Sequence, residues 1–547
     1  MKITIDDHVV SAVEGETILD AATRLGITIP TLCRIKGEHE PASCLVCLVK
    51  CKGKFIPSCA TKIEDGMVVE SETEEVHQLR RTALELLLSD HSGDCYAPCQ
   101  LACPARLDIP LMLRQIRSEN PEAAIQTIKE TIPFPAVLGR VCPKPCEKIC
   151  RRKELDKAVE ICTVKRYAAD CDLSQQQSYI PPVLPSTGKR VIIIGAGPSG
   201  LSAAFYLARL GHHVALYTQG KKLGGRLRTI DESQLPASVL DAEIRTILSL
   251  PIDYYPDEQL DWMFPETFTE LQSSFDAVLL CTGQCDPAIL KQSGLETVQG
   301  RLRVDLPSFQ TSVPNVFATG TIFRAKTTMI VRSVADGREA AESIDRFLQH
   351  GTAHQTVLPY YGVKLGKLPY EELTAFAEIN RNNKTVNNSA ETVSTTVVPF
   401  ENILSKNILS ENISSETVLS ETISSKMVQE ASRCLHCDCR GRSQCRLLQF
   451  ASQYQANSHR FEESVRKPFT IQRSGKIVFE AGKCIKCGIC VNVAKKADEE
   501  WGLTFLGRGF DVRIGVPFGE SFQKALTKSA SEAVRLCPTA ALSFDDV

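Results

Sequence analysis

Apolar and polar residues alternate at the start of the chain, and the period then lengthens. Residues 2–11 show the two-residue period of β-strands. The apolar positions of 17–25 fall on one face of a helix, which we expect to end at Gly26. A second helical pattern runs over 74–88. Together these patterns predict a small α+β domain over residues 1–75.

The remaining chain changes its pattern three more times. Residues 91–185 are rich in Cys and Pro and have helical periods, whereas 189–350 alternate strand and helix patterns, which predicts a parallel sheet. Residues 380–427 are Ser-, Thr- and Asn-rich degenerate repeats, which are typical of a flexible tether. We therefore predict a multidomain α/β and α+β protein with domains at 1–75, 76–185, 186–352, 353–428 (a linker, partly disordered) and 429–547.

Composition and charge narrow the classes of function. The 547 residues are 43% hydrophobic, enough for several buried cores, and 63 basic residues nearly balance 65 acidic ones. Without a basic excess we expect no nucleic acid or anionic membrane as a partner. The acidic N-terminus differs from a signal peptide, and no apolar run approaches the ~18 residues of a membrane span. We expect a cytoplasmic protein without membrane insertion.

The chain has 23 cysteines, and in a reducing compartment they favour metal or redox chemistry over disulfides. They fall into local groups, as sites built from loops require. The first group has the spacing C-x10-C-x2-C-x11-C in a strand, helix and loop context. Thiolates so arranged suit a [2Fe-2S] cluster in a β-grasp ferredoxin domain, with the ligands Cys33, Cys44, Cys47 and Cys59.

This first group, with the later GMVVES, resembles the N-terminal domain of the large iron-sulfur subunit of respiratory complex I and related hydrogenases. The resemblance implies one [2Fe-2S] cluster. A zinc knuckle is the structural alternative, although zinc loops usually pair two short C-x2-C elements. Cys51 is left over, and we expect it to be a bystander.

Two further groups lie in HSGDCYAPCQLACP and GRVCPKPCEKICRRKELDKAVEIC. Their C-x3-C-P, DIP and GRVCP segments resemble the N-terminal cluster domain of the glutamate synthase small subunit and of dihydropyrimidine dehydrogenase. That resemblance implies two interleaved [4Fe-4S] sites. It implies that the ligands of one cluster are His91, Cys95, Cys99 and Cys150. The ligands of the other cluster would be Cys103, Cys142, Cys146 and Cys162.

His91 stands about where that family has a cysteine, so a histidine ligand is one interpretation. The complex I subunit carries a His-x3-Cys motif, which offers the rival grouping of His91 with Cys95, Cys99 and Cys103. The structural alternative for His91 is a cation near the C-terminal end of the preceding helix. The role of Cys162 as a ligand is also open, because the fourth ligand varies in that segment of the family.

The segment KRVIIIGAGPSGLSAAFYLARLGHHVALY predicts a buried strand, a glycine turn, a helix and a second strand. Glycines permit the tight turn and the close approach of a pyrophosphate to the helix N-terminus. With the later GGR, FDAVLLCTG and VPNVFATG, the segment resembles the FAD domain of the glutamate synthase family. The resemblance implies FAD contacts from Gly195, Gly197, Gly200, Gly224, Gly225, Arg226 and Gly320.

Three departures separate the chain from that flavoprotein family. Thr218 and Thr321 replace two expected acids, which weakens the case for FAD and leaves a fold that keeps only its structure as the alternative. Only about 30 residues separate Cys281 from the VPNV segment, where the family inserts a nicotinamide domain of at least one βαβ unit. We expect no NAD(P) site in this chain. Cys281 and Cys285 are predicted to be packing residues.

The C-terminal module has two cysteine groups. The spacing C-x2-C-x-C-x5-C suits a [4Fe-4S] cluster or structural zinc. A second run, C-x2-C-x2-C, begins like a bacterial ferredoxin but has Ala494 in place of the next thiol, and a later Cys-Pro supplies the fourth ligand. This run resembles the complex I and hydrogenase subunits. The candidate ligands are Cys434, Cys437, Cys439 and Cys445 in the first group, and Cys484, Cys487, Cys490 and Cys537 in the second.

These groups predict an electron-transfer subunit with one [2Fe-2S] and three to four [4Fe-4S] clusters around a flavin-type fold. Its partners would be ferredoxin or other redox subunits of a hydrogenase, formate dehydrogenase or transhydrogenase complex, in which terminal catalysis belongs to those subunits. No side chain suggests a general acid or base, so we nominate no catalytic residue. Two alternatives are a glutamate-synthase-like NAD(P)H-dependent flavin oxidoreductase and a zinc-stapled scaffold.

Overall fold

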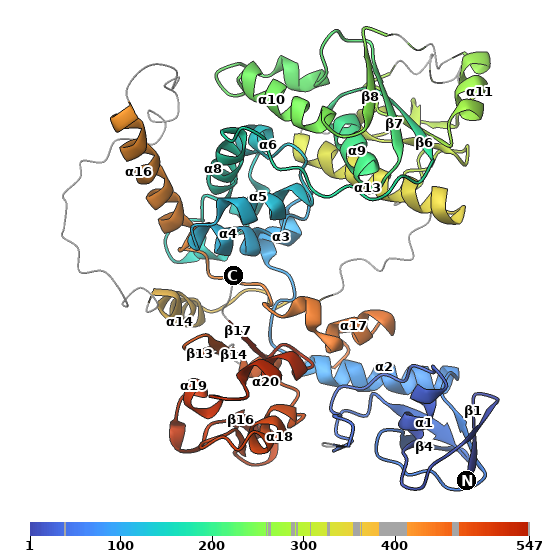
Figure 1. The fold of residues 1–547 in the computed structure, drawn as a ribbon, viewed down its shortest axis with the longest axis vertical. Helices are drawn as coiled ribbons and strands as arrows, with labels where there is room; N and C mark the ends of the chain where they lie inside the picture. The colour runs from blue at the N-terminus through green and yellow to red at the C-terminus, as the bar shows by residue number, and fades with distance from the viewer. Residues whose placement is uncertain are drawn as a thin grey trace. The chain divides into compact units, whose positions relative to one another are not determined.

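The computed structural model of the chain divides into two compact units. Unit 1 comprises residues 1–97, 358–379 and 436–546, and unit 2 comprises 98–357 and 380–435, with Val547. Figure 1 shows the helices and strands of both units. The structure describes the chain except for residues 38–39, 259, 261–263, 286–289, 291–293, 307, 325–328, 354–361, 363, 382–412, 462–469 and 545–547.

Unit 1 begins with a five-stranded sheet in the order β2-β1-β5-β3-β4. Its central pair, β1 and β5, is parallel and the other pairs are antiparallel. Helix α1 begins after Thr17, which forms a reciprocal capping box with Asp20. The predicted α+β domain and its helix are therefore confirmed. The elements are β1 (Lys2–Ile5), β2 (His8–Ser11), α1 (Ile18–Arg24), β3 (Leu48–Cys51), β4 (Lys54–Pro57) and β5 (Met67–Glu70).

Helix α2 (Glu74–Ser89) joins this sheet to the C-terminal module within unit 1. Arg80 is fully buried on α2 and donates a hydrogen bond to the Tyr454 hydroxyl at 3.0 Å. The module has a sheet in the order β13-β14-β17 and a hairpin of β15 and β16. Its elements are α17 (Arg446–Gln453), β13 (Gln472–Ser474), β14 (Ile477–Phe479), α18 (Ile489–Lys496), β15 (Thr504–Leu506), β16 (Arg513–Gly515), α19 (Phe522–Ala525), α20 (Ala530–Leu536) and β17 (Leu542–Phe544).

Unit 2 opens with short helices that carry several of the cysteines. Asp108 and Asn120 cap α4 and α5, and a proline stands in the first turn of each. The elements are α3 (Pro98–Ala102), α4 (Ile109–Arg117), α5 (Pro121–Lys129), α6 (Pro135–Val141), α7 (Pro145–Lys148) and α8 (Ile161–Leu173).

A parallel sheet in the order β12-β9-β6-β7-β8 forms the rest of unit 2, which confirms the predicted fold class. Helices α9 and α13 pack closely, because a Cβ at Gly337 would lie only 2.2 Å from the Ser199 carbonyl oxygen. The elements are β6 (Arg190–Ile194), α9 (Pro198–Arg209), β7 (His213–Thr218), α10 (Ala237–Leu248), β8 (Ile252–Pro256), α11 (Pro265–Ser274), β9 (Ala277–Leu280), β10 (Thr297–Val298), β11 (Arg301–Leu302), β12 (Val316–Ala318) and α13 (Ile330–His350).

Part of the predicted linker differs from a flexible tether. Residues Tyr370–Arg381 form α14 and Ile413–Ala431 form α16, while 382–412 lie outside the described residues. The Tyr167 hydroxyl of α8 is hydrogen-bonded to the Ser424 hydroxyl of α16 at 3.1 Å. Helix α16 packs against α4 and α8, and this packing stabilises the helix. The local composition does not reveal such a partner surface.

Candidate metal centres and dinucleotide site

The four thiols of the first predicted group lie together in unit 1. Cys33, Cys44, Cys47 and Cys59 are each at most 5% exposed. Cys33 is hydrogen-bonded to Cys44 and Cys59, and Cys59 to Cys47. The hydrogen bond from Cys59 lowers the pKa of the Cys47 thiol to about 7. The same hydrogen bonds lower the pKa of Cys33 and raise the pKa of Cys44 and Cys59. Four converging thiols fit a cluster that binds thiolates. Cys51, on β3, lies in the same hydrophobic core as Cys47 and Cys59.

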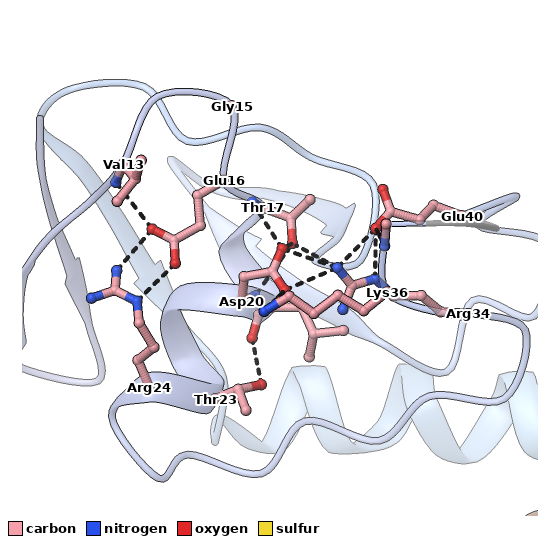
Figure 2. Close-up of polar contacts among 12 residues, drawn as sticks. Val13, Gly15, Glu16, Thr17, Asp20, Thr23, Arg24, Arg34, Lys36 and Glu40 are labelled. Atoms are coloured by element: carbon pink, nitrogen blue, oxygen red, sulfur yellow. Dashed lines mark hydrogen bonds and ion pairs between the residues drawn. The ribbon is translucent and has the colours of Figure 1, made fainter.

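Arg34 ties the loop that follows Cys33 to helix α1 (Figure 2). Its guanidinium group, 7% exposed, pairs with Asp20 at 2.9 Å and Glu40 at 2.8 Å. Burial acts to raise the pKa of Asp20, but hydrogen bonds from Thr17 and Arg34 hold it well below its usual range. The Asp20 carboxylate therefore caps α1 and also holds the loop that follows Cys33 in place.

The second C-terminal group lies in the same core as the first thiols. The buried core contains Cys33, Cys44 and Cys487. Cys484, Cys490 and Cys537 are partly buried and pack against this core. Burial raises the pKa of Cys487 to about 12, and the charges of Cys537, Cys484 and Cys33 act in the same direction. Two thiol sets are thus neighbours within one unit, the arrangement that passing electrons between clusters requires.

Unit 2 holds four thiols around a buried lysine. Cys142 and Cys162 are hydrogen-bonded to each other, and Cys146 is hydrogen-bonded to Cys162. Lys165 of α8 is 4% exposed and donates to the Leu138 carbonyl oxygen at 3.2 Å. Burial acts to lower its pKa, but the thiol charges hold that pKa above its ordinary value. Lys165 is therefore a buried cation beside the middle-domain thiol set, namely Cys103, Cys142, Cys146 and Cys162.

The other predicted ligands divide between the units. His91 and Cys95 belong to unit 1, whereas Cys99 and Cys150 belong to unit 2 and pack against its core. Burial lowers the pKa of His91 to about 3, with a further contribution from Lys483. The group in RCLHCDCRGRSQC also divides, since Cys434 belongs to unit 2 and Cys437, Cys439 and Cys445 belong to unit 1.

The predicted glycine turn forms one wall of a cavity of about 530 Å³ in unit 2. A Cβ at Gly200 would lie 1.9 Å from the Gly195 carbonyl oxygen, and one at Gly195 would lie 2.4 Å from the Cys281 carbonyl oxygen. A Cβ at Gly197 would meet nothing within 4 Å. The backbone before α9 is thus open to a ligand, and the helix N-terminus favours an anion there. These features fit a dinucleotide.

The other predicted cofactor contacts lie beside the glycine turn, since the Gly224 amide donates to the Ala196 carbonyl oxygen at 2.8 Å and a Cβ at Gly225 would lie 2.9 Å from Cα of Gly197. Gly224 and Gly320 have positive φ angles, and Gly225 and Arg226 line the cavity. Arg226 donates to the Ser333 hydroxyl at 2.8 Å, and burial lowers its pKa. Thr218 and Thr321 also line the cavity, where the family resemblance leads one to expect acids.

Cys281 is a lining residue that sequence reasoning assigned to packing. It follows β9 at the carboxyl edge of the sheet, and burial raises the pKa of its thiol to about 12. The position of Cys281 directly after a parallel strand could have indicated that it lines a ligand site, because ligands bind at that edge of open α/β sheets. The thiol supplies a buried, neutral surface beside the glycine turn.

Among the described residues, no three His, Cys, Asp or Glu side chains surround a position for a single metal ion. None of the described helices combines the length and apolar character needed to cross a membrane.

Comparison with known families defines the class of these domains. Residues 1–74 match a 2Fe-2S iron-sulfur cluster binding domain. Residues 71–177 match dihydropyrimidine dehydrogenase domain II, 4Fe-4S cluster, and residues 193–257 match an NAD(P)-binding Rossmann-like domain. The chain therefore combines iron-sulfur domains of both kinds with a Rossmann-like nucleotide-binding domain.

Individual relatives resemble about a third of the chain. The NADPH-Fe(3+) oxidoreductase subunit beta of Geobacter sulfurreducens is 36% identical over 34% of this chain and 28% of its own length. The NADP(+)-dependent formate dehydrogenase subunit beta of Moorella thermoacetica is 34% identical over 34% and 29%. The dihydropyrimidine dehydrogenase subunit PreT of Salmonella typhimurium is 35% identical over 34% and 45%. The matched part thus spans less than half of each relative.

Proposed function

We propose that this chain is an iron-sulfur flavoprotein subunit that relays electrons between partner subunits of a cytoplasmic oxidoreductase complex. The observation that carries the proposal is the shared core of unit 1, in which Cys33 and Cys487 of two different thiol sets interact. The relatives named above are oxidoreductase subunits, which supports the same class.

The relay would hold one [2Fe-2S] cluster at Cys33, Cys44, Cys47 and Cys59. One [4Fe-4S] cluster would lie at the set ending in Cys537, and another at the middle-domain thiol set. FAD would occupy the cavity, with its pyrophosphate at Gly197 and the N-terminus of α9. When bound, FAD supplies the conversion between two-electron and one-electron transfer. The chain's own residues bind that group, exclude water from it and fix its orientation.

The nicotinamide reaction would belong to a partner. Between β9 and β12, the described residues include the short hairpin of β10 and β11, and a βαβ unit takes about 30 residues. The partners would be ferredoxin or other subunits of a hydrogenase, formate dehydrogenase or transhydrogenase complex. The glutamate-synthase-like alternative predicts that NADPH or NADH alone bleaches the visible spectrum of the isolated chain, and we expect no bleaching.

The first test is the content of iron, acid-labile sulfide, zinc and flavin in full-length protein purified anaerobically. One [2Fe-2S] and three to four [4Fe-4S] clusters predict about 14–18 irons with matching sulfide. The Cys47→Ser variant should lose the [2Fe-2S] signal in electron paramagnetic resonance (EPR) spectra after dithionite reduction. Cys51→Ser, a matched change in the same domain, should keep it. Zinc without iron would overturn the proposal in favour of a scaffold.

A further inference from the structure

The segment 92–96 is held between two loops of the C-terminal module in unit 1. The Ser92 amide donates to the Gly482 carbonyl oxygen at 2.7 Å. A Cβ at Gly93 would lie 2.6 Å from Cε of Lys483, so the lysine stem passes directly over the glycine. On the other side, the Arg442 guanidinium lies 4.4 Å from the centroid of the Tyr96 ring. Cys95 lies between these contacts.

The loop 439–445 is itself fixed against the segment that follows Cys537. A Cβ at Gly441 would lie 2.5 Å from the Ala540 Cβ, and the Leu447 amide donates to the Pro538 carbonyl oxygen at 3.1 Å. Cys95 and Cys445 are 7% and 8% exposed and belong to one core. The loop between the two C-terminal thiols is tight, because the Arg442 amide donates to the Cys439 carbonyl oxygen at 3.3 Å and the Cys445 amide donates to the Arg442 carbonyl oxygen at 3.2 Å. Three thiols from opposite ends of the sequence therefore gather in one place.

His91 is the fourth side chain of this neighbourhood. Its Nδ1 atom is buried and has no hydrogen-bond partner among the described residues. A buried polar atom without a partner is unfavourable, and a bond to a metal would remove that cost. Lys483, whose stem passes over Gly93, forms an ion pair with Glu480 at 2.5 Å.

We propose that Cys95, Cys439 and Cys445, with His91 as the fourth ligand, hold one [4Fe-4S] cluster within unit 1. This ligand set replaces both groupings drawn from local motifs, because it separates Cys95 from Cys99 and joins it to the C-terminal loop. The inference rests on the proposed function, since it assumes that the chain carries iron-sulfur clusters. It adds a third centre to the core that already joins the sets of Cys33 and Cys487.

The test is a double-mutant comparison on full-length protein that is reconstituted anaerobically. Cys95→Ser and Cys445→Ser should each remove the same four irons and sulfides, and the double variant should lose no more than either single one. Combining Cys95→Ser with Cys99→Ser should instead remove a second set of irons. The [2Fe-2S] EPR signal of the Cys33 set should persist throughout, which reports that unit 1 remains folded.

His91→Cys tests the fourth ligand without depending on activity. An anionic thiolate in place of a neutral imidazole should lower the reduction potential of this one cluster and leave the [2Fe-2S] potential unchanged. An unchanged potential would remove His91 from the ligand set.

Three results separate failure of this inference from failure of the proposed function. Additive iron losses for Cys95→Ser and Cys445→Ser, with non-additive losses for Cys95→Ser and Cys99→Ser, would overturn the inference alone. One zinc lost in both Cys95→Ser and Cys445→Ser, with iron elsewhere intact, would also overturn it alone. A wild-type protein without iron would overturn both.

Discussion

Glu243 of α10 caps helix α6, which carries Cys142 at its end. The Glu243 carboxylate is 3% exposed, and its two oxygens accept hydrogen bonds from the Ala136 and Val137 amides at 2.7 Å each. Phe134 at the N-cap makes no side-chain hydrogen bond to the helix, so the cap comes from α10 instead. The contact joins the Rossmann-like domain to the middle-domain thiol set within unit 2.

The perturbation is Glu243→Gln, which keeps the size of the side chain but replaces one acceptor oxygen by an NH2 group. One buried amide then lacks an acceptor, at a cost of about 1–3 kcal/mol. That cost corresponds to roughly 5- to 150-fold faster exchange of the α6 amides when exchange follows local opening. Hydrogen–deuterium exchange of the peptide that contains Ala136 and Val137 measures it. Glu342→Gln, a change of a half-exposed glutamate on α13, is the matched control.

The same carboxyl group predicts a pH dependence. Burial raises the pKa of Glu243 from 4.5 to about 8, against the opposing effect of the two amide hydrogen bonds. The native state therefore holds a proton that the unfolded state releases, and stability declines as pH rises through this window, by up to about 1.4 kcal/mol per pH unit. Beyond the change in intrinsic exchange rate, the wild-type protein should lose α6 protection between about pH 4.5 and 8, and Glu243→Gln should flatten that dependence. Equal exchange and equal pH slopes in both proteins would refute the reasoning.

Three further predictions concern the clusters and the cavity. Lys165→Met should lower the reduction potential of the middle-domain cluster by on the order of 100 mV, because a buried positive charge is lost, and Lys165→Arg should restore most of it in a redox titration followed by EPR. Gly200→Ala should abolish flavin retention after gel filtration, because its Cβ would clash with the Gly195 carbonyl oxygen, whereas Gly220→Ala, with its nearest atom at 3.4 Å, should retain flavin. Thr218→Glu should tighten FAD binding about 10- to 100-fold in a fluorescence titration by restoring an acceptor for the ribose, and unchanged affinity would argue against that ribose position.

The sequence by itself determined the local structures and the chemistry that each offers. The helix over 17–25 follows from its apolar period and from the cap between Thr17 and Asp20, which lie within one turn. The parallel sheet follows from buried apolar runs that alternate with helices, and the glycine turn follows from close backbone approaches that only glycine permits. These features depend on neighbours in the sequence, so a pattern of a few residues is sufficient to predict them.

Only the tertiary structure decided which local motifs meet. Cys95 and Cys99 stand four positions apart, yet one packs with Cys445 in unit 1 and the other against the core of unit 2. The cap from Glu243 and the approach of Cys281 to the cavity likewise join segments that are far apart in the chain. Spacing between cysteines limits which loops can form but contains no information on distant partners. Those partners are selected by the fit of buried side chains across the folded core, which is a property of the whole unit.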